Sequence, residues 1–167
     1  MAPSPVVSAA LTALVACFAF AVMYGGQQSK HQGGGEYQLG SGKMFDAIAP
    51  RYDLINKVIS LGLDMQWRRA MIDGLELRPG DRVVDMATGT ADVAILISQE
   101  LAKLESRGGD TMPGSDVPAV IGIDPSANML DVGRKKAADA GLSSRVVLQI
   151  GDAQDLSDIA DGSVDKV

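Results

Sequence analysis

The sequence predicts an α/β fold with a parallel sheet from about residue 43 onward. Three short β-rich segments, 82–87, 119–124 and 145–150, alternate with stretches whose apolar residues recur at helical spacing. An acidic residue also stands at or directly after the end of each β-rich segment. Strands that alternate with helices are typical of parallel sheets covered by helices. The same carboxylates make the ends of these strands the natural place to look for a site.

The helices of this fold are indicated by periodicity, and the turns by glycine and proline. Apolar residues in 45–59 have helical spacing, although Pro50 should interrupt or restart that helix. A second helix carries Trp67, Met71 and Leu75 on one face. Further helices are expected after the first β-rich segment, beginning near residue 93, and over 125–140, where Gly141 closes the helix.

Composition excludes several classes of function. Fifteen Lys and Arg against 21 Asp and Glu give a net charge of −6, which argues against binding to nucleic acid. One cysteine and one histidine among 167 residues cannot supply a disulfide framework or a His/Cys metal cluster. The chemistry must therefore use carboxylates, hydroxyls, backbone groups or a cofactor.

The segment that precedes the α/β domain divides into two parts. Residues 1–24 contain a run of 18 uncharged residues, 6–23. As a helix this run would span roughly 27 Å, close to the thickness of a bilayer core. A membrane anchor, a cleaved targeting segment and a buried core helix are the three interpretations. Residues 25–42 are rich in glycine and predict a flexible linker to the domain at 43–167.

The first acidic position, Asp85, is followed by a loop that contains Gly89 and Thr90. A glycine turn between a strand and a helix brings backbone N–H groups close to a ligand. A dinucleotide-binding loop would carry the pattern G-x-G-x-x-G, of which only the first glycine is kept. A carboxylate here repels a pyrophosphate and attracts an ammonium or sulfonium group. The loop favours the methionine end of S-adenosylmethionine, with a capped strand–helix turn as the alternative.

Two further acidic positions follow the later strands. Asp124 can accept hydrogen bonds from the hydroxyls of a ribose, and it can equally cap the helix expected over 125–140. Asp152 can accept a hydrogen bond from an adenine amino group while Ala153 lets the ring approach. An aspartate after a strand is also a common turn residue. Both alternatives stay open.

The motifs resemble a known family. Residues 44–56 read Met-Phe-Asp-Ala-Ile-Ala-Pro-Arg-Tyr-Asp-Leu-Ile-Asn, and Trp-Arg-Arg follows at 67–69. Together with Asp-Met-Ala-Thr-Gly-Thr-Ala-Asp at 85–92, they resemble the quinone C-methyltransferases of ubiquinone and menaquinone biosynthesis. The resemblance covers about residues 43–167 and implies a Rossmann-like class I methyltransferase sandwich. Ala91 departs from the commoner glycine.

This resemblance also assigns residues and a cofactor. The family's contacts with S-adenosylmethionine fall by position on Thr90, Asp124, Asp152 and Ala153, and Asp85 and Gly89 would line the methionine end. Tyr52 is the candidate for substrate contact or catalysis, although a tyrosine at helical spacing is also a common core residue. No metal is required, because the positive sulfur activates the methyl group. The family's later signature would lie beyond Val167, so we expect the chain to be the N-terminal, truncated part of a longer protein.

The implied function is methyl transfer from S-adenosylmethionine to a ring carbon of a prenylated quinol. A prenyl tail resides in a bilayer, so a membrane is an expected partner, as is a quinone-biosynthesis complex. In a eukaryote the mitochondrial inner membrane or a plastid would be the location. The alternatives are a class I methyltransferase with another small-molecule substrate and a non-catalytic, membrane-tethered cofactor-binding fragment. Residues 1–167 alone are expected to be inactive.

Overall fold

The computed structural model describes residues 42–108 and 118–167. The predicted hydrophobic segment 1–24 and all but the last residue of the predicted linker 25–42 lie outside these ranges. Within them, no helix combines the length and the apolar character that a membrane crossing requires. The predictions for residues 1–24 are therefore not tested by the structure.

A three-stranded parallel sheet forms the centre of the domain. Its strands, in their spatial order, are β1 (Val83–Met86), β2 (Val120–Asp124) and β3 (Val146–Ile150). β2 is central, and its first residue, Val120, lies opposite both Val83 and Val146. The predicted α/β fold with a parallel sheet is confirmed for the described residues.

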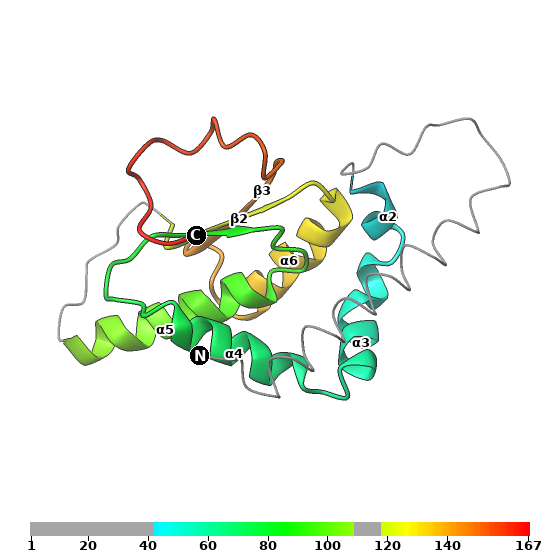
Figure 1. Cartoon of the computed structure of the whole chain (residues 1–167), viewed down its shortest axis with the longest axis horizontal. Coiled ribbons are helices and arrows are strands. Elements are labelled where there is room, and N and C mark those ends of the chain that lie inside the picture. Colours follow the sequence, from blue (N-terminus) through cyan, green and yellow to red (C-terminus); the bar gives the residue numbers. More distant parts are fainter. Residues whose placement is uncertain (1–41, 109–117) are drawn as a thin grey trace, which may run out of the picture.

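The last residues of the chain run along the free edge of β1. Lys166 forms a parallel bridge with Val83, and the Val84 N–H donates to the Lys166 carbonyl at 3.0 Å. The C-terminus accordingly lies beside the strands (Figure 1). This pairing agrees with the prediction that residues 163–167 begin a further strand.

Two long helices cover one face of the sheet. They are α5 (Asp92–Gly108), which follows β1, and α6 (Ala127–Asp139), which follows β2. Both lie on the same side of the strands (Figure 1). The core between them and the sheet consists of apolar residues that are less than a tenth exposed, among them Val83, Val120, Val146, Leu148, Ile97, Leu101, Leu130 and Ala137. This core forms because each helix turns one apolar stripe toward the strands.

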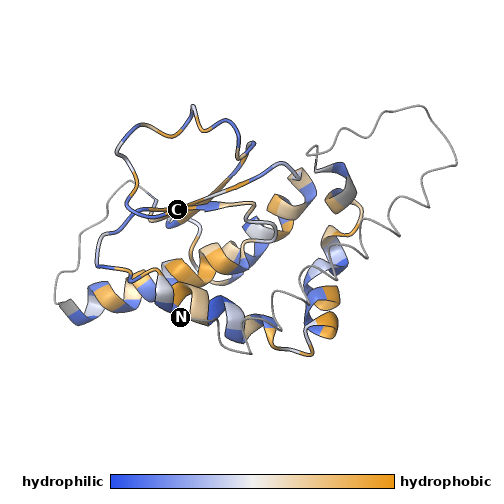
Figure 2. Cartoon of the chain, viewed as in Figure 1, coloured by the Kyte–Doolittle hydropathy of each residue, from blue (hydrophilic) through white to orange (hydrophobic). Residues whose placement is uncertain are grey.

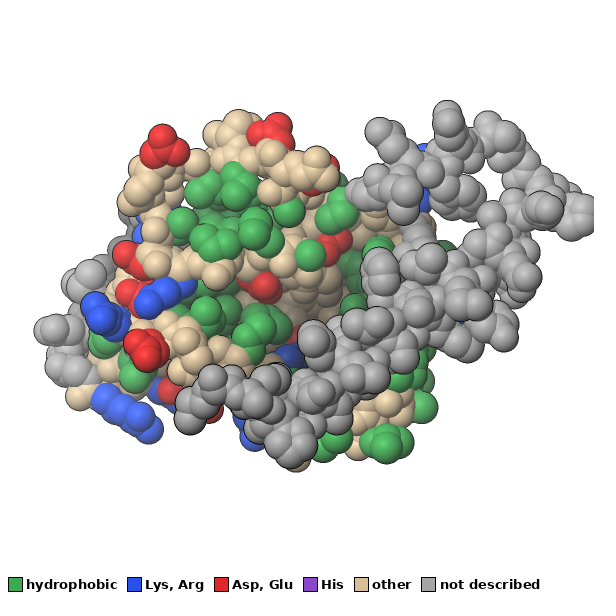
Figure 3. Space-filling view, in the orientation of Figure 1, with side chains coloured by type: hydrophobic (Ala, Val, Ile, Leu, Met, Phe, Trp, Pro, Cys, Tyr) green, Lys and Arg blue, Asp and Glu red, His purple; other side chains and the backbone are tan. Residues whose placement is uncertain are grey.

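The opposite face of the sheet is apolar and partly exposed. Along β3, Val146 and Leu148 are buried against the helices, whereas Val147 between them is 39% exposed. Met86, at the end of β1, is also on this face and is 39% exposed. Figure 3 shows apolar side chains at the surface on this side of the strands.

In the part of the chain that the structure describes, three helices precede the sheet. They are α2 (Lys43–Asp46), α3 (Ala49–Ile59) and α4 (Asp64–Gly74). Pro50 lies in the first turn of α3, so the predicted interruption falls between α2 and α3. α3 buries only Ala49, and its outer turns are apolar (Figure 2). In α4 the buried residue is Ile72, and Leu75 packs against the core as predicted. Met71 is 48% exposed, so its predicted place on the apolar face was wrong.

Gly42 belongs to the folded domain, which corrects its assignment to the linker. Its carbonyl accepts the N–H groups of Phe45 and Asp46, and its φ of 71° is left-handed. A Cβ at this position would lie 2.7 Å from the Pro125 carbonyl oxygen. The close approach of α2 to the segment before α6 therefore requires a residue without a side chain.

Small residues also set the distance between α6 and the loop after β1. Ala91 has a left-handed φ of 63° and is fully buried. A Cβ on Gly133 of α6 would lie 2.9 Å from the Ala91 Cβ and 2.8 Å from Leu148 Cδ1. Ala91 can occupy the place of the commoner glycine because α6 presents a glycine opposite it.

Replacing Gly133 by alanine is expected to destabilise the fold. The added methyl group would overlap Ala91 and Leu148, and overpacking of a core costs about 1–3 kcal/mol. Gly74→Ala is the matched control, because a Cβ at the end of α4 meets nothing within 4 Å. Urea unfolding should show a loss for Gly133→Ala and no loss for the control. Equal stability of both variants would contradict this packing.

Candidate functional site

The site lies at the carboxyl edge of the sheet. Asp85 in β1 and Asp124 at the end of β2 come together there, because parallel strands end at the same edge. Residue Asp152 follows β3 at this edge as well. The structure thus gathers the three acidic positions that the sequence singled out, from three different strands.

The loop between β1 and α5 makes a sharp turn at this edge. Ala87, Gly89 and Ala91 all have left-handed φ angles, of 56°, 55° and 63°. The Thr88 N–H donates to the Ile123 carbonyl at 3.0 Å, which ties the turn to β2. A Cβ on Gly89 would meet no atom within 4 Å, so the tip of the loop borders open space. A ligand can therefore approach the backbone at Gly89.

Asp124 connects this loop to the start of α6. Its Oδ2 accepts the Gly89 N–H at 2.9 Å, and its Oδ1 accepts the Ser126 N–H at 2.8 Å. The residue as a whole is only 8% exposed. Both oxygens keep further lone pairs, because an ionised carboxylate has about four acceptor sites. The residue that caps α6 is Ser126, whose hydroxyl accepts the Met129 N–H, and Asp124 acts one step further back by holding Ser126. The ribose contact of Asp124 stays a prediction.

Asp85 is a partly buried carboxylate close to Asp124. Its Oδ2 accepts the Thr88 hydroxyl at 2.6 Å. Burial raises the pKa of Asp85 above its ordinary value; the hydrogen bond from Thr88 opposes this rise, and the negative charge of Asp124 adds to it. Two neighbouring carboxylates make this edge a favourable place for a cationic group.

Asp152 and Ala153 are exposed beyond the end of β3. The Asp152 Oδ1 accepts the Gln154 N–H at 2.9 Å, so the carboxylate stabilises its own turn. This contact corresponds to the turn alternative. The predicted adenine contact is not tested by the structure.

Thr90 contacts helix α3, and Tyr52, which belongs to α3, contacts helix α2. Thr90 is 3% exposed, and its hydroxyl donates to Asp53 Oδ1 at 2.5 Å. Tyr52 is half-buried, with its ring edge-on to Phe45 at a centroid distance of 6.3 Å. This packing fits the core role of Tyr52, and its catalytic role stays a prediction.

A set of charged residues around Thr90 was not predicted from the sequence. Lys136 of α6 donates to Asp53 at 2.9 Å and also contacts Asp92, which pairs with Arg68 of α4. Asp53 and Asp92 lie within the motifs at 44–56 and 85–92, so the sequence offered a signal for both. Lys136 carried no local signal, because its partner Asp53 lies 83 positions away in the chain.

Fold and site together define a Rossmann-like methyltransferase domain. The features that define it are a parallel sheet, a glycine turn bordering open space, and carboxylates at the ends of neighbouring strands. These groups fit S-adenosylmethionine, which carries an ammonium, a sulfonium and a ribose.

Comparison with known proteins identifies the family. The sequence model of the ubiE/COQ5 methyltransferase family matches residues 33–167, and the chain belongs to this family. The predicted resemblance to the quinone C-methyltransferases is thereby confirmed.

Two relatives illustrate the match. The ubiquinone/menaquinone biosynthesis C-methyltransferase UbiE of Geotalea daltonii is 35% identical over 125 residues, which are 75% of this chain and 47% of the relative. A demethylmenaquinone methyltransferase of Bacteroides fragilis is 38% identical over 125 residues, covering 75% and 45%. The chain thus spans about half the length of the curated relatives it matches.

A solved structure supports the fold alone. The [4+2]-cyclase SpnF superposes with a TM-score of 0.51 and 21% identity, over 69% of this chain and 42% of SpnF. SpnF is named as a cyclase, so a similar fold does not determine the reaction.

Asp85→Asn is expected to stabilise the protein at neutral pH. Because folding raises the Asp85 pKa, its ionised form destabilises the folded state. This penalty is absent below the unfolded value of about 4 and is complete above the raised pKa. Urea unfolding should therefore show a gain for Asp85→Asn at pH 7 and none at pH 3. Asp139→Asn, at an exposed position of α6, should change neither. Lower stability of Asp85→Asn at pH 7 would show that the Thr88 contact outweighs burial.

Proposed function

We propose that the protein takes part in methyl transfer from S-adenosylmethionine to a ring carbon of a prenylated quinol in quinone biosynthesis. The observation that carries this proposal is the pair of carboxylates, Asp85 and Asp124, beside the open turn at Gly89. Membership of the ubiE/COQ5 methyltransferase family and the names of the relatives support the substrate class.

Each residue of the site has a distinct task in this proposal. Asp85 provides a negative charge in a poorly solvated place, where it attracts an ammonium or sulfonium group. Asp124 offers its remaining lone pairs to ribose hydroxyls while its bonds to Gly89 and Ser126 hold it in place. Asp152 and Ala153 border the adenine.

The protein contributes alignment and exclusion of water. When bound, S-adenosylmethionine supplies a methyl group that its own positive sulfur activates. The left-handed turn and the hydrogen bond from Thr88 to β2 hold the loop in a fixed position, which lowers the entropic cost of bringing two reactants together. Tyr52 is the residue of α3 proposed to contact the quinol.

The quinol substrate places this activity at a membrane. A prenyl tail partitions into a bilayer, so we include membrane association in the proposal, at the mitochondrial inner membrane or a plastid if the source is eukaryotic. Support comes from an apolar stripe on α3 and the turn after it, where Leu54, Val58 and Leu61 are 64%, 64% and 88% exposed. Membership of a quinone-biosynthesis complex is part of the same proposal.

Cofactor binding is tested by calorimetry with S-adenosylhomocysteine. Asp124→Asn should weaken binding by about 10- to 100-fold, because hydrogen bonds to a charged group contribute about 1.5–3 kcal/mol. Asp131→Asn is the matched control, since Asp131 is an exposed residue of α6 paired with Arg134. Equal affinity of Asp124→Asn and the wild type would contradict the ribose role.

Methyl transfer is tested with S-adenosylmethionine that carries a labelled methyl group. The assay compares residues 1–167 with the full product of the gene, using a short-chain demethyl-quinol and a catechol that lacks a prenyl tail. We expect the full product to label the quinol ring carbon and not the catechol. Label on the catechol alone would favour another small-molecule methyltransferase, and label on neither would favour a cofactor-binding function.

A further inference from the structure

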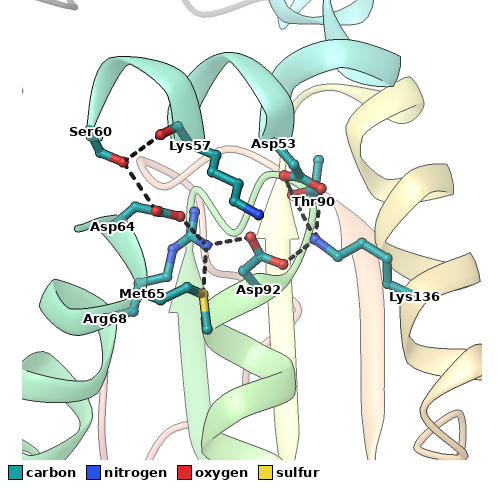
Figure 4. A network of polar contacts seen from close by, with 9 residues as sticks. All are labelled: Asp53, Lys57, Ser60, Asp64, Met65, Arg68, Thr90, Asp92 and Lys136. Carbon is teal, nitrogen blue, oxygen red and sulfur yellow. Dashed lines mark hydrogen bonds and ion pairs between the residues drawn. The ribbon is translucent and has the colours of Figure 1, made fainter. Parts of the chain in front are cut away.

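A lysine on α6 stands among acceptors from three other parts of the fold. Lys136 Nζ lies 2.9 Å from Asp53 Oδ2 and 3.3 Å from Thr90 Oγ1, and it also contacts Asp92 Oδ1. These acceptors come from α3, from the loop after β1 and from the start of α5. Figure 4 shows the three oxygen-bearing groups converging on the lysine. The lysine side chain is 29% exposed, so its contacts are only partly screened by solvent.

Asp53 uses its two oxygens for two different partners. Its Oδ1 accepts the Thr90 hydroxyl at 2.5 Å, and its Oδ2 accepts Lys136. One carboxylate of α3 therefore joins the proposed cofactor loop to α6. Hydrogen bonds in which a partner is ionised are roughly twice as strong as neutral ones. The orientation of the buried Thr90 side chain is thus set from outside its own loop.

The same cluster continues into α4. Arg68 lies 2.5 Å from Asp92 and 3.3 Å from Asp64, and Asp64 accepts the Ser60 hydroxyl at 3.1 Å (Figure 4). α3 and α4 each bury only one residue. Since apolar burial is small for these helices, polar contacts account for much of their attachment.

We propose that Asp53 and Lys136 are positioning residues for cofactor binding, which act by holding Thr90 and the turn around it. This inference rests on the proposed function, because it takes the loop at Thr90 as the cofactor loop. It connects α3, the helix that carries the candidate quinol contact Tyr52, to the cofactor loop. The placement of α3 and the affinity for the cofactor are then coupled.

The test compares substitutions at Lys136 and Asp53 with a substitution at the neighbouring Lys135 of α6. Lys136→Met removes the cation, and Asp53→Asn removes the negative charge and one of the two acceptor oxygens. Lys136→Arg keeps a cation that can restore the contact. Lys135→Met is the matched control, because it removes the same charge one residue away, from an exposed side chain. All variants are made in the full chain.

Two measurements separate a positioning role from a general loss of structure. Hydrogen exchange without ligand should show faster exchange at the amides of residues 88–91 in Lys136→Met and Asp53→Asn, and unchanged exchange in Lys135→Met. Calorimetry with S-adenosylhomocysteine should show roughly tenfold weaker binding for the first two variants, as is usual for coupled contacts. In a Thr90→Val background, Asp53→Asn should cause no further loss of affinity. A general structural defect would still lower the affinity further.

The results separate the positioning role of Asp53 and Lys136 from cofactor binding itself. Loop exchange that does not respond to Asp53→Asn or Lys136→Met overturns the proposal, whatever the affinity. A faster-exchanging loop with unchanged affinity also overturns the positioning role and leaves the proposed function intact. Absence of binding by the wild type contradicts cofactor binding itself. Recovery of both readouts in Lys136→Arg supports the proposal.

Discussion

The carboxylate of Asp124 is the interaction on which the geometry of the sheet edge depends. It accepts one N–H from the turn after β1 and one from the first residues before α6. Ser126, which it holds, in turn accepts the Met129 N–H and donates to Asp46 of α2. A single buried acid thereby connects the loop, the helix start and the preceding helices. Its loss would leave two backbone donors without their partner, at a cost of about 1–3 kcal/mol each.

Close approach of backbone to backbone is the second constraint on this edge. The loop after β1 can lie against α6 only because Gly133 leaves room for Ala91, and against β2 only because Gly122 leaves room for Thr88. Left-handed conformations at non-glycine residues cost about 1–3 kcal/mol and persist where the surroundings enforce them. Ala87 and Ala91 carry this strain beside the candidate site, where a fixed loop has a functional use.

Packing differs between the two halves of the described domain. The sheet, α5 and α6 share an apolar core, whereas α3 and α4 attach through the charged contacts of Lys136 and Arg68. Elements that bury little apolar surface open at lower free energy than the core does. Helices α3 and α4, which ion pairs attach to the rest of the fold, are therefore expected to open before the sheet, α5 and α6 do.

The sequence by itself determined the order of strands and helices after residue 82 and the acidic residue at the end of each strand, because periodicity and turn residues are local properties. The residues at the strand ends also pointed to S-adenosylmethionine, and the family resemblance added contact roles for Thr90 and Tyr52. Only the tertiary structure decided that Asp124 bridges two loops, that Gly42 packs on Pro125, and that Ile72 rather than Met71 faces the core. It alone revealed Lys136 between Asp53 and Asp92. These contacts join residues far apart in the chain, and no local pattern encodes which distant charges a parallel sheet will bring together.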